Sequence, residues 1–243
     1  MVQCKICSSK TELLFKQKIR NKYNAEYYHC ANCGFIFINN PTWLKEAYKE
    51  PINIEDTGLV QRNIDFARLT NVIIKTFFNK KGKYLDYAAG YGLFVRLMKD
   101  KGINFYWDDL YTQNLFAKGH EYNNKDKIEL ITCFECFEHL SDPTPEIEKM
   151  LKISKNILFS TELAPENINK IGDWAYLGLS HGQHISFYSE KTINWIAKKY
   201  GLNYYKIGRL GLITEKRINH PFAILLLGLF YFIPKGIARI MTW

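Results

Sequence analysis

Four cysteines near the N-terminus are spaced as metal ligands. They form two C-x2-C pairs separated by 22 residues, Cys4 with Cys7 and Cys30 with Cys33. Each pair makes a tight knuckle that aims two thiolates at one point, and two knuckles complete the tetrahedral four-sulfur shell of structural zinc. Gly34 directly follows the second pair, where a knuckle needs a positive φ. We therefore expect a zinc ribbon over residues 1–40, whose closed metal shell leaves no position for a substrate.

Cys133 and Cys136 form a third pair with the same spacing, inside the apolar stretch ITCFECFEHL. No second pair lies nearby, so these two thiols supply only half of a four-sulfur site. We expect them to be buried and to pack as small hydrophobic side chains.

A glycine-containing turn, LDYAAGYG at residues 85–92, follows a predicted strand and opens a predicted helix. Gly90 and Gly92 let a ligand approach the backbone closely, at the position where α/β sheets bind cofactors. Val95 stands where a dinucleotide fingerprint has its third glycine, and Asp86 would repel a pyrophosphate. The pattern favours a ligand with a positive, amine-bearing end, such as the methionine moiety of S-adenosylmethionine (SAM).

Asp108 and Asp109 end the next predicted strand, 22 and 23 residues after Asp86. An acid at that place can accept hydrogen bonds from the ribose hydroxyls of a cofactor. The structural alternatives are a turn-capping role for Asp86 and a solvated strand end at Asp109. The occurrence of both Asp86 and Asp109 in one strand–helix–strand unit favours cofactor binding.

The elements that must position these residues alternate along the chain. Strands are predicted at 83–89, 103–111, 128–137 and 156–163, with β-like sequence at 203–214, and helices at 60–78, 93–102, 144–154 and 189–201. Residues 41–81 are expected to be a linker with helices that lead into the core. This alternation predicts an α/β fold with a mostly parallel sheet and helices on both faces.

Residues 83–215 resemble a class I SAM-dependent methyltransferase, through LDYAAGYG, the acid in WDDLY and the stretch CFECFEHLSDP. The resemblance implies a Rossmann-like methyltransferase domain over 82–215. The element HGQHISFYSEKTINWIAKKYG at 181–201 is similar to methyltransferases of sugar and cell-surface polysaccharide biosynthesis. Some of these, notably sugar C-methyltransferases, also carry an N-terminal four-cysteine zinc domain.

The resemblance also implies the residues that contact SAM. They are Asp86, Ala88, Gly90, Gly92, Asp109, Phe134 and Glu135. Two departures stand out. Ala88 replaces the first loop glycine, which either crowds or shifts the loop, and the short stretch between Asp109 and Ile128 indicates that one helix–strand pair is abbreviated.

Methyl transfer to a hydroxyl, or to a carbon next to a carbonyl, needs a general base, and histidine suits that role near neutral pH. His139, preceded by Glu138, stands at a predicted strand end; its structural alternative is to tie that strand end to a loop. The resemblance implies that His184 is the base, and His181 is close enough in sequence to assist. An enzyme that acts by positioning alone, without a base, is the alternative.

The formal net charge of +9 is unevenly distributed. Residues 1–50 hold 8 basic and 4 acidic side chains, residues 204–243 hold 6 and 1, and the segment between them holds 19 of each. A neutral central domain does not favour a nucleic-acid groove within it. The N-terminus has no signal-peptide pattern, so we expect a cytoplasmic chain with reduced thiols.

The C-terminal segment, 216–243, combines basic residues with twelve consecutive apolar residues at 222–233. Twelve residues are too few to cross a bilayer. We expect either peripheral membrane contact through 221–240, at the inner face of the cell membrane, or burial in a core or dimer contact.

The sequence therefore predicts SAM-dependent methyl transfer to a nucleotide- or lipid-linked sugar, a precursor of a cell-surface polysaccharide. One alternative is a zinc-ribbon RNA methyltransferase, although the NPPY-type motif for base amines is missing. Another is a degenerate methyltransferase domain that serves as a binding module, for which Ala88 is the main argument. The sequence does not specify an oligomeric state.

Overall fold

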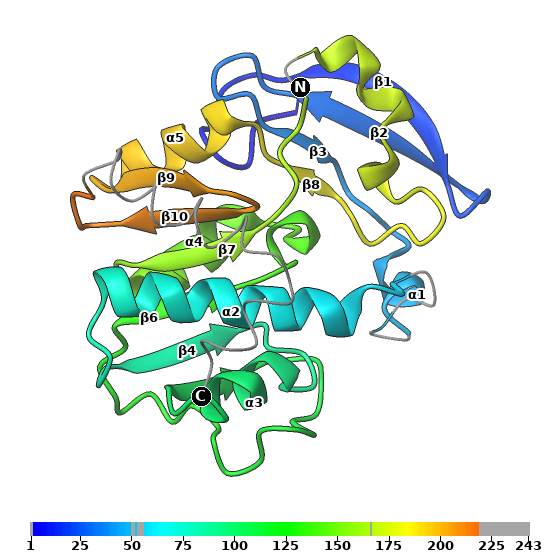
Figure 1. Ribbon diagram of the computed structural model, residues 1–243. Helices are drawn as coiled ribbons and strands as arrows, with labels where there is room; N and C mark the ends of the chain where they lie inside the picture. The colour runs from blue at the N-terminus through cyan, green and yellow to red at the C-terminus, as the bar shows by residue number, and fades with distance from the viewer. Residues whose placement is uncertain (1, 50–51, 53–55, 166, 219–243) are drawn as a thin grey trace.

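Six strands form the larger sheet of the computed structural model, which describes residues 2–49, 52, 56–165 and 167–218. The strands are β4 (Lys83–Tyr87), β5 (Asn104–Asp108), β6 (Leu130–Cys133), β7 (Ile157–Ser160), β9 (Asn203–Ile207) and β10 (Leu210–Thr214). Their order is β5-β4-β6-β7-β10-β9. The first four run parallel, and β10 runs antiparallel to both of its neighbours (Figure 1).

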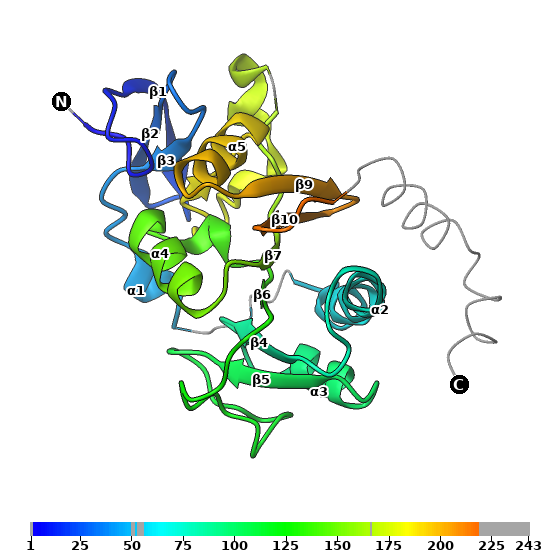
Figure 2. The same ribbon diagram turned by 90° about the vertical axis from the view of Figure 1, so that its left-hand side faces the viewer.

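Helices cover both faces of this sheet (Figure 2). The helices α2 (Leu59–Phe77) and α3 (Leu93–Lys99) lie on one face, and α4 (Pro143–Ile153) and α5 (Glu190–Lys199) lie on the other. Successive strand residues point to opposite faces, so Tyr84 packs in the cluster that includes α2 and α3, and Leu85 packs in the cluster that includes α4 and α5. Both faces are therefore apolar and buried, which confirms the predicted α/β class.

The abbreviated helix–strand pair lies after β5. Residues 109–129 contain no helix or extended strand, and a single parallel bridge between Trp107 and Glu121 is what remains of a further strand at this edge. The predicted strand at 128–137 is also shorter than expected, because the backbone turns after Cys133 into a loop and the 3-10 helix η1 (Phe137–His139). The β-like sequence at 203–214 is the antiparallel hairpin of β9 and β10.

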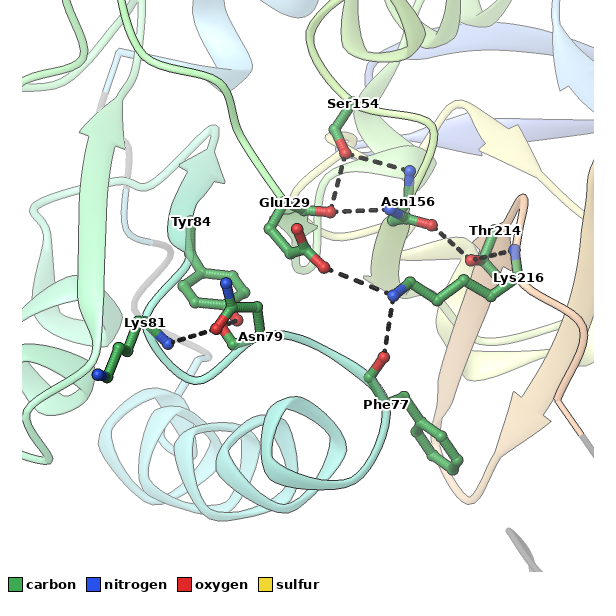
Figure 3. Close-up of polar contacts among 9 residues, drawn as sticks. All are labelled: Phe77, Asn79, Lys81, Tyr84, Glu129, Ser154, Asn156, Thr214 and Lys216. Atoms are coloured by element: carbon green, nitrogen blue, oxygen red, sulfur yellow. Dashed lines mark hydrogen bonds and ion pairs between the residues drawn. The ribbon is translucent and has the colours of Figure 1, made fainter.

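The amino-terminal ends of β6 and β7 are joined to the end of β10 by side-chain hydrogen bonds (Figure 3). The Asn156 amide and the Ser154 hydroxyl both donate to the carbonyl of Glu129, at 2.8 and 3.2 Å, and Thr214 donates to Asn156. Lys216 donates to the carbonyl of Phe77 at 3.1 Å and so ties the end of α2 to the same edge. These polar residues have structural roles at the edge opposite the carboxyl ends of the parallel strands.

A second, four-stranded antiparallel sheet contains the predicted ribbon. Its order is β1 (Glu12–Ile19), β2 (Tyr23–His29), β3 (Ile36–Ile38) and β8 (Ser186–Phe187). The short helix α1 (Leu44–Ala47) follows β3 in the chain. Because β8 comes from the later half of the chain, the sheet joins residues 1–40 to the domain predicted at 82–215. The two predicted domains therefore share one sheet and one core, in which Cys30 and Cys33 pack with Leu85 and Phe159.

Both cysteine knuckles dock on the helices of the larger domain. The Lys5 carbonyl accepts a hydrogen bond from Thr144 at 2.7 Å, and Lys191 donates to the carbonyl of Ala31 at 2.8 Å. Gly34 has a φ of +76°, and a Cβ there would lie 2.4 Å from Oγ of Ser189. That hydroxyl caps α5 by accepting from the Thr192 amide, so the glycine is required for both its conformation and its close approach.

Residues 219–243 lie outside the described residues, and with them most of the predicted segment 216–243 and the whole of the proposed membrane contact at 221–240. Among the residues that the structure does describe, no helix combines the length and apolar character needed to cross a membrane.

Replacement of Gly34 by alanine should lower the free energy of unfolding more than replacement of Gly102. Gly102 has a similar φ of +72°, but nothing lies within 4 Å of its Cβ position. Gly102→Ala should cost about 1 kcal/mol for the left-handed backbone, and Gly34→Ala should lose at least ~1 kcal/mol more, because the clash displaces the α5 cap. Chemical unfolding measures both variants, and equal losses would show that the knuckle does not depend on this contact.

Candidate active site and metal centre

The candidate residues gather at one edge of the larger sheet, beyond the carboxyl ends of its parallel strands. Gly90 follows β4, Asp109 follows β5, Glu135 follows β6 and Thr161 follows β7. Parallel strands bring the segments that follow them to the same edge, where open α/β sheets bind their ligands.

The turn after β4 keeps the backbone of a glycine loop despite its alanine. Ala88, Gly90 and Gly92 all have positive φ values, of 57°, 54° and 87°. Ala88 is exposed, so its Cβ does not collide with the core, and its left-handed backbone costs about 1–2 kcal/mol. Nothing lies within 4 Å of the Cβ position of Gly90, which leaves room for a ligand against the backbone. The loop therefore fits the cofactor that the sequence predicts.

Asp86 is buried, with 4% of its surface exposed, and stands beside Thr132 in the register of β4 and β6. The Thr132 hydroxyl donates to Oδ1 of Asp86 at 2.6 Å. Burial raises the pKa of Asp86 to about 7, against the opposing effect of this hydrogen bond. The carboxyl therefore changes its charge near neutral pH, beside the loop that would receive a cationic cofactor.

Asp109 holds the glycine loop in place. One carboxylate oxygen accepts from the Gly90 amide at 2.9 Å, and the other accepts from the amides of Tyr111 and Thr112, both at 2.8 Å. A carboxylate has about four acceptor positions, so one remains for a further donor. Burial and the nearby Asp109 charge raise the pKa of Asp108. The ribose contact predicted for Asp109 stays a prediction.

Glu135 and Phe134 connect the end of β6 to α2. Ser160 donates to Oε1 of Glu135 at 2.6 Å, and Arg62 lies 3.5 Å from its other oxygen. The Arg62 guanidinium also donates to both oxygens of Asp56, at 3.0 and 2.7 Å. Phe134 packs against aromatic rings of α2 and α3. Arg62 was not predicted from the sequence, because no local pattern reveals a contact across 73 residues.

Glu138, His139 and His184 come together, with one potential ligand atom from each within 4.8 Å of the others. Nδ1 of His184 lies 2.6 Å from the carbonyl of Tyr176. Nδ1 of His139 lies 3.1 Å from the carbonyl of Gln183. The His181 ring is 4.8 Å from the His184 ring, centroid to centroid, so all three predicted histidines belong to one cluster.

Burial disfavours the charged imidazolium forms of His139 and His184. Desolvation lowers the pKa of His139 and lowers that of His184 to about 4. We assign the Nδ1 proton of each ring from its carbonyl partner, which leaves the lone pair on Nε2. Tyr48, whose hydroxyl lies 2.9 Å from Nδ1 of His139, was missed because it belongs to the segment predicted as a linker.

A surface groove of about 490 Å³ is lined in part by His181 of this cluster. Its lining includes Gln17 of β1, Asp173, Trp174 and His181. The groove therefore lies between β1 of the ribbon and residues 172–181, and His181 is the member of the histidine cluster that lines it.

The four N-terminal cysteines converge as predicted. Sγ of Cys4 lies 3.5 Å from that of Cys33, and Sγ of Cys7 lies 3.4 Å from that of Cys30. These separations approach the ~3.8 Å between sulfurs in a tetrahedral zinc site with bonds of ~2.3 Å. The cluster could hold structural zinc, whereas Cys133 and Cys136 are buried in the core, as expected.

Affinity for SAM should rise with pH through the pKa of Asp86. The raised pKa keeps the carboxyl protonated below about pH 7, and the positive charges of SAM favour its ionised form. Between pH 6 and 7.5 the ionised fraction, and hence the affinity, should increase about eightfold. Titration calorimetry on the wild type, Asp86→Asn and the surface control Asp100→Asn measures this. An unchanged pH dependence in Asp86→Asn would refute the role of Asp86.

Several solved structures are similar to this chain at low identity. Magnesium protoporphyrin IX methyltransferase from Synechocystis PCC 6803, with bound SAH, is 13% identical, with 72% of this chain and 96% of that chain covered and a TM-score of 0.47. OxaC is 18% identical, with coverages of 72% and 51% and a TM-score of 0.48. CalO1, a methyltransferase in calicheamicin biosynthesis, is 13% identical, with coverages of 71% and 59% and a TM-score of 0.46.

No curated protein matches the sequence. A family model described as a methyltransferase domain matches residues 59–207, which include α2, the glycine loop, both candidate strand-end acids and the histidine cluster. The match spans more than half of the chain, and it agrees with the α/β sheet and the loop geometry. The chain therefore belongs to the methyltransferase domain family and is a SAM-dependent methyltransferase.

Proposed function

We propose that this enzyme methylates a sugar in a nucleotide- or lipid-linked precursor of a cell-surface polysaccharide, with His184 as the general base. The observation that carries the proposal is the histidine cluster of His139, His181 and His184 beside the carboxyl ends of the parallel strands, in which His181 also lines the groove. A base of this kind is needed for a hydroxyl or an enolisable carbon, neither of which is nucleophilic while it keeps its proton.

SAM supplies an activated methyl group, so the protein has to orient the acceptor and remove its proton. Asp86, the loop from Ala88 to Gly92, and Asp109 would hold the cofactor, and Phe134 and Glu135 border it. His184 would take the acceptor proton on Nε2, while the Tyr176 carbonyl orients the ring through Nδ1. His139 and His181 would assist from positions next to His184.

The groove supports a sugar acceptor. Gln17 and Asp173 offer hydrogen-bonding groups to hydroxyls, and Trp174 offers a flat apolar surface to a sugar ring. The proposed location is cytoplasmic, with peripheral contact at the inner face of the membrane through 221–240, where lipid-linked sugars are accessible.

The ribbon charges argue against an RNA substrate. Lys16 is paired with Glu26 at 2.6 Å, and both Arg20 and Lys22 are paired with Glu46, at 3.3 and 3.0 Å. Paired basic residues gain less from contact with phosphates, because their neighbouring carboxylates repel the same ligand. The RNA alternative therefore loses much of the support it drew from the net charge.

The acceptor class is tested by incubating the full-length chain with methyl-labelled SAM and separate panels of nucleotide-linked sugars, lipid-linked sugars and RNA. We expect label on a sugar-containing acceptor only. Label on RNA alone would refute the proposed substrate. SAM binding without transfer to any panel would instead support the binding-module alternative.

His184→Ala should lower turnover by about 10²–10⁴-fold with unchanged SAM affinity, because it removes the base and not the cofactor contacts. In the wild type, turnover should rise with pH through about 4 and stay level near neutrality, since the lowered pKa of His184 keeps its lone pair available. His120→Ala, outside the cluster, is the control. Normal turnover by His184→Ala would contradict the base assignment.

A further inference from the structure

We propose that Glu138, His139 and His184 form a second metal site, which binds a divalent transition-metal ion and is independent of the four cysteines. One potential ligand atom from each residue lies within 4.8 Å of the other two. The 3-10 helix η1 places Glu138 and His139, and the Ile185 amide, which donates to the Glu138 carbonyl at 2.9 Å, places His184 beside them. The site is thus held by backbone as well as by side chains.

The surroundings of both histidines are those of metal ligands. A metal-binding histidine usually donates its other ring N–H to a carbonyl or carboxylate, which fixes the tautomer and the orientation of the ring. Here the carbonyls of Gln183 and Tyr176 lie at Nδ1 of His139 and His184. We assign the Tyr48 hydroxyl hydrogen to the same Gln183 carbonyl, 3.4 Å away, so that the Tyr48 oxygen accepts from Nδ1 of His139 at 2.9 Å. Both Nε2 lone pairs remain for a cation.

The burial of Glu138 supports a metal site independently of the histidine geometry. Its side chain is buried, with 1% exposed, and Oε2 has no hydrogen-bond partner among the described residues. A buried carboxylate oxygen without a partner is costly, because it has lost water and gained nothing in exchange. A cation between Oε2 and the two imidazoles would supply the missing interaction.

The donor set selects the class of metal. Two imidazole nitrogens and one carboxylate suit Zn²⁺, Mn²⁺, Fe²⁺, Co²⁺ or Ni²⁺ better than Ca²⁺ or Mg²⁺, which prefer oxygen ligands. Three protein ligands leave coordination positions open, in contrast to the closed four-sulfur ribbon site.

A bound ion would change the chemistry of the active site. It uses the lone pair of His184, and on the proposed function that lone pair removes the acceptor proton. Metal binding and general-base catalysis at His184 are therefore mutually exclusive, and loading of the second site inhibits methyl transfer.

The test is titration of the zinc-loaded, full-length chain with Co²⁺ alone, followed by absorption spectroscopy and metal analysis. We expect one equivalent of Co²⁺ with d–d bands but without thiolate-to-cobalt charge transfer, because the new site contains no sulfur. Glu138→Gln, which nearly preserves shape, and His139→Ala should each weaken binding at least tenfold. His120→Ala, which removes an imidazole outside the cluster, should bind as the wild type does.

Three results would overturn the proposal: no saturable binding, equal binding by Glu138→Gln, or a spectrum dominated by thiolate ligation. Circular dichroism shows whether each variant is folded. If His139→Ala does not fold, Glu138→Gln alone decides the test. Co²⁺ binding is measured without a methyl acceptor. A failure to bind Co²⁺ therefore leaves the assignment of His184 as the base intact. Normal turnover by His184→Ala would refute the base and leave the metal site standing.

Discussion

The backbone of Ile185 is the point on which the arrangement of this enzyme depends. Its carbonyl accepts from the amide of Ile38, in the ribbon sheet, at 2.9 Å, and its amide donates to the carbonyl of Glu138, in η1 after β6, also at 2.9 Å. One residue therefore links the cysteine-containing sheet to the candidate active-site edge of the larger sheet. His184, immediately before it, takes its position from these two bonds, and β8 follows directly in register with β3. The ribbon is thereby part of the active-site framework.

This linkage gives the proposed zinc a role far from its own ligands. The knuckles pack in the same core as the strands β4, β6 and β7, and their backbone contacts reach the N-terminal ends of α4 and α5. A four-sulfur metal site stabilises the local fold directly, because its ligands come together only in the folded chain. A zinc ion bound there would therefore also support the pairing of β3 with β8, the strand that directly follows the segment carrying His184.

Burial sets the electrostatics of the same edge. It raises the pKa of Asp86 to about 7 and lowers that of His184 to about 4, in each case by disfavouring the charged form. A neutral imidazole and an acid that becomes charged near neutrality suit the cationic cofactor and uncharged acceptor of the proposed reaction. Glu138 is the group that this environment leaves with an oxygen unpaired, and for that reason it is where a cation is most favourable.

Sequence alone was sufficient where the determining pattern is local. The doubled C-x2-C spacing, the alternation of strands and helices, the glycine turn and the strand-end acids each depend on a few neighbouring residues, and the described fold agrees with them. Tertiary structure decided the rest. Arg62 reaches Glu135, Tyr48 reaches His139, and β8 joins the ribbon, because long-range packing brings together segments that share no periodicity. It also decided that Ala88 keeps a glycine-like backbone and that Glu138 is buried without a full set of partners, since conformation and desolvation are properties of the folded chain.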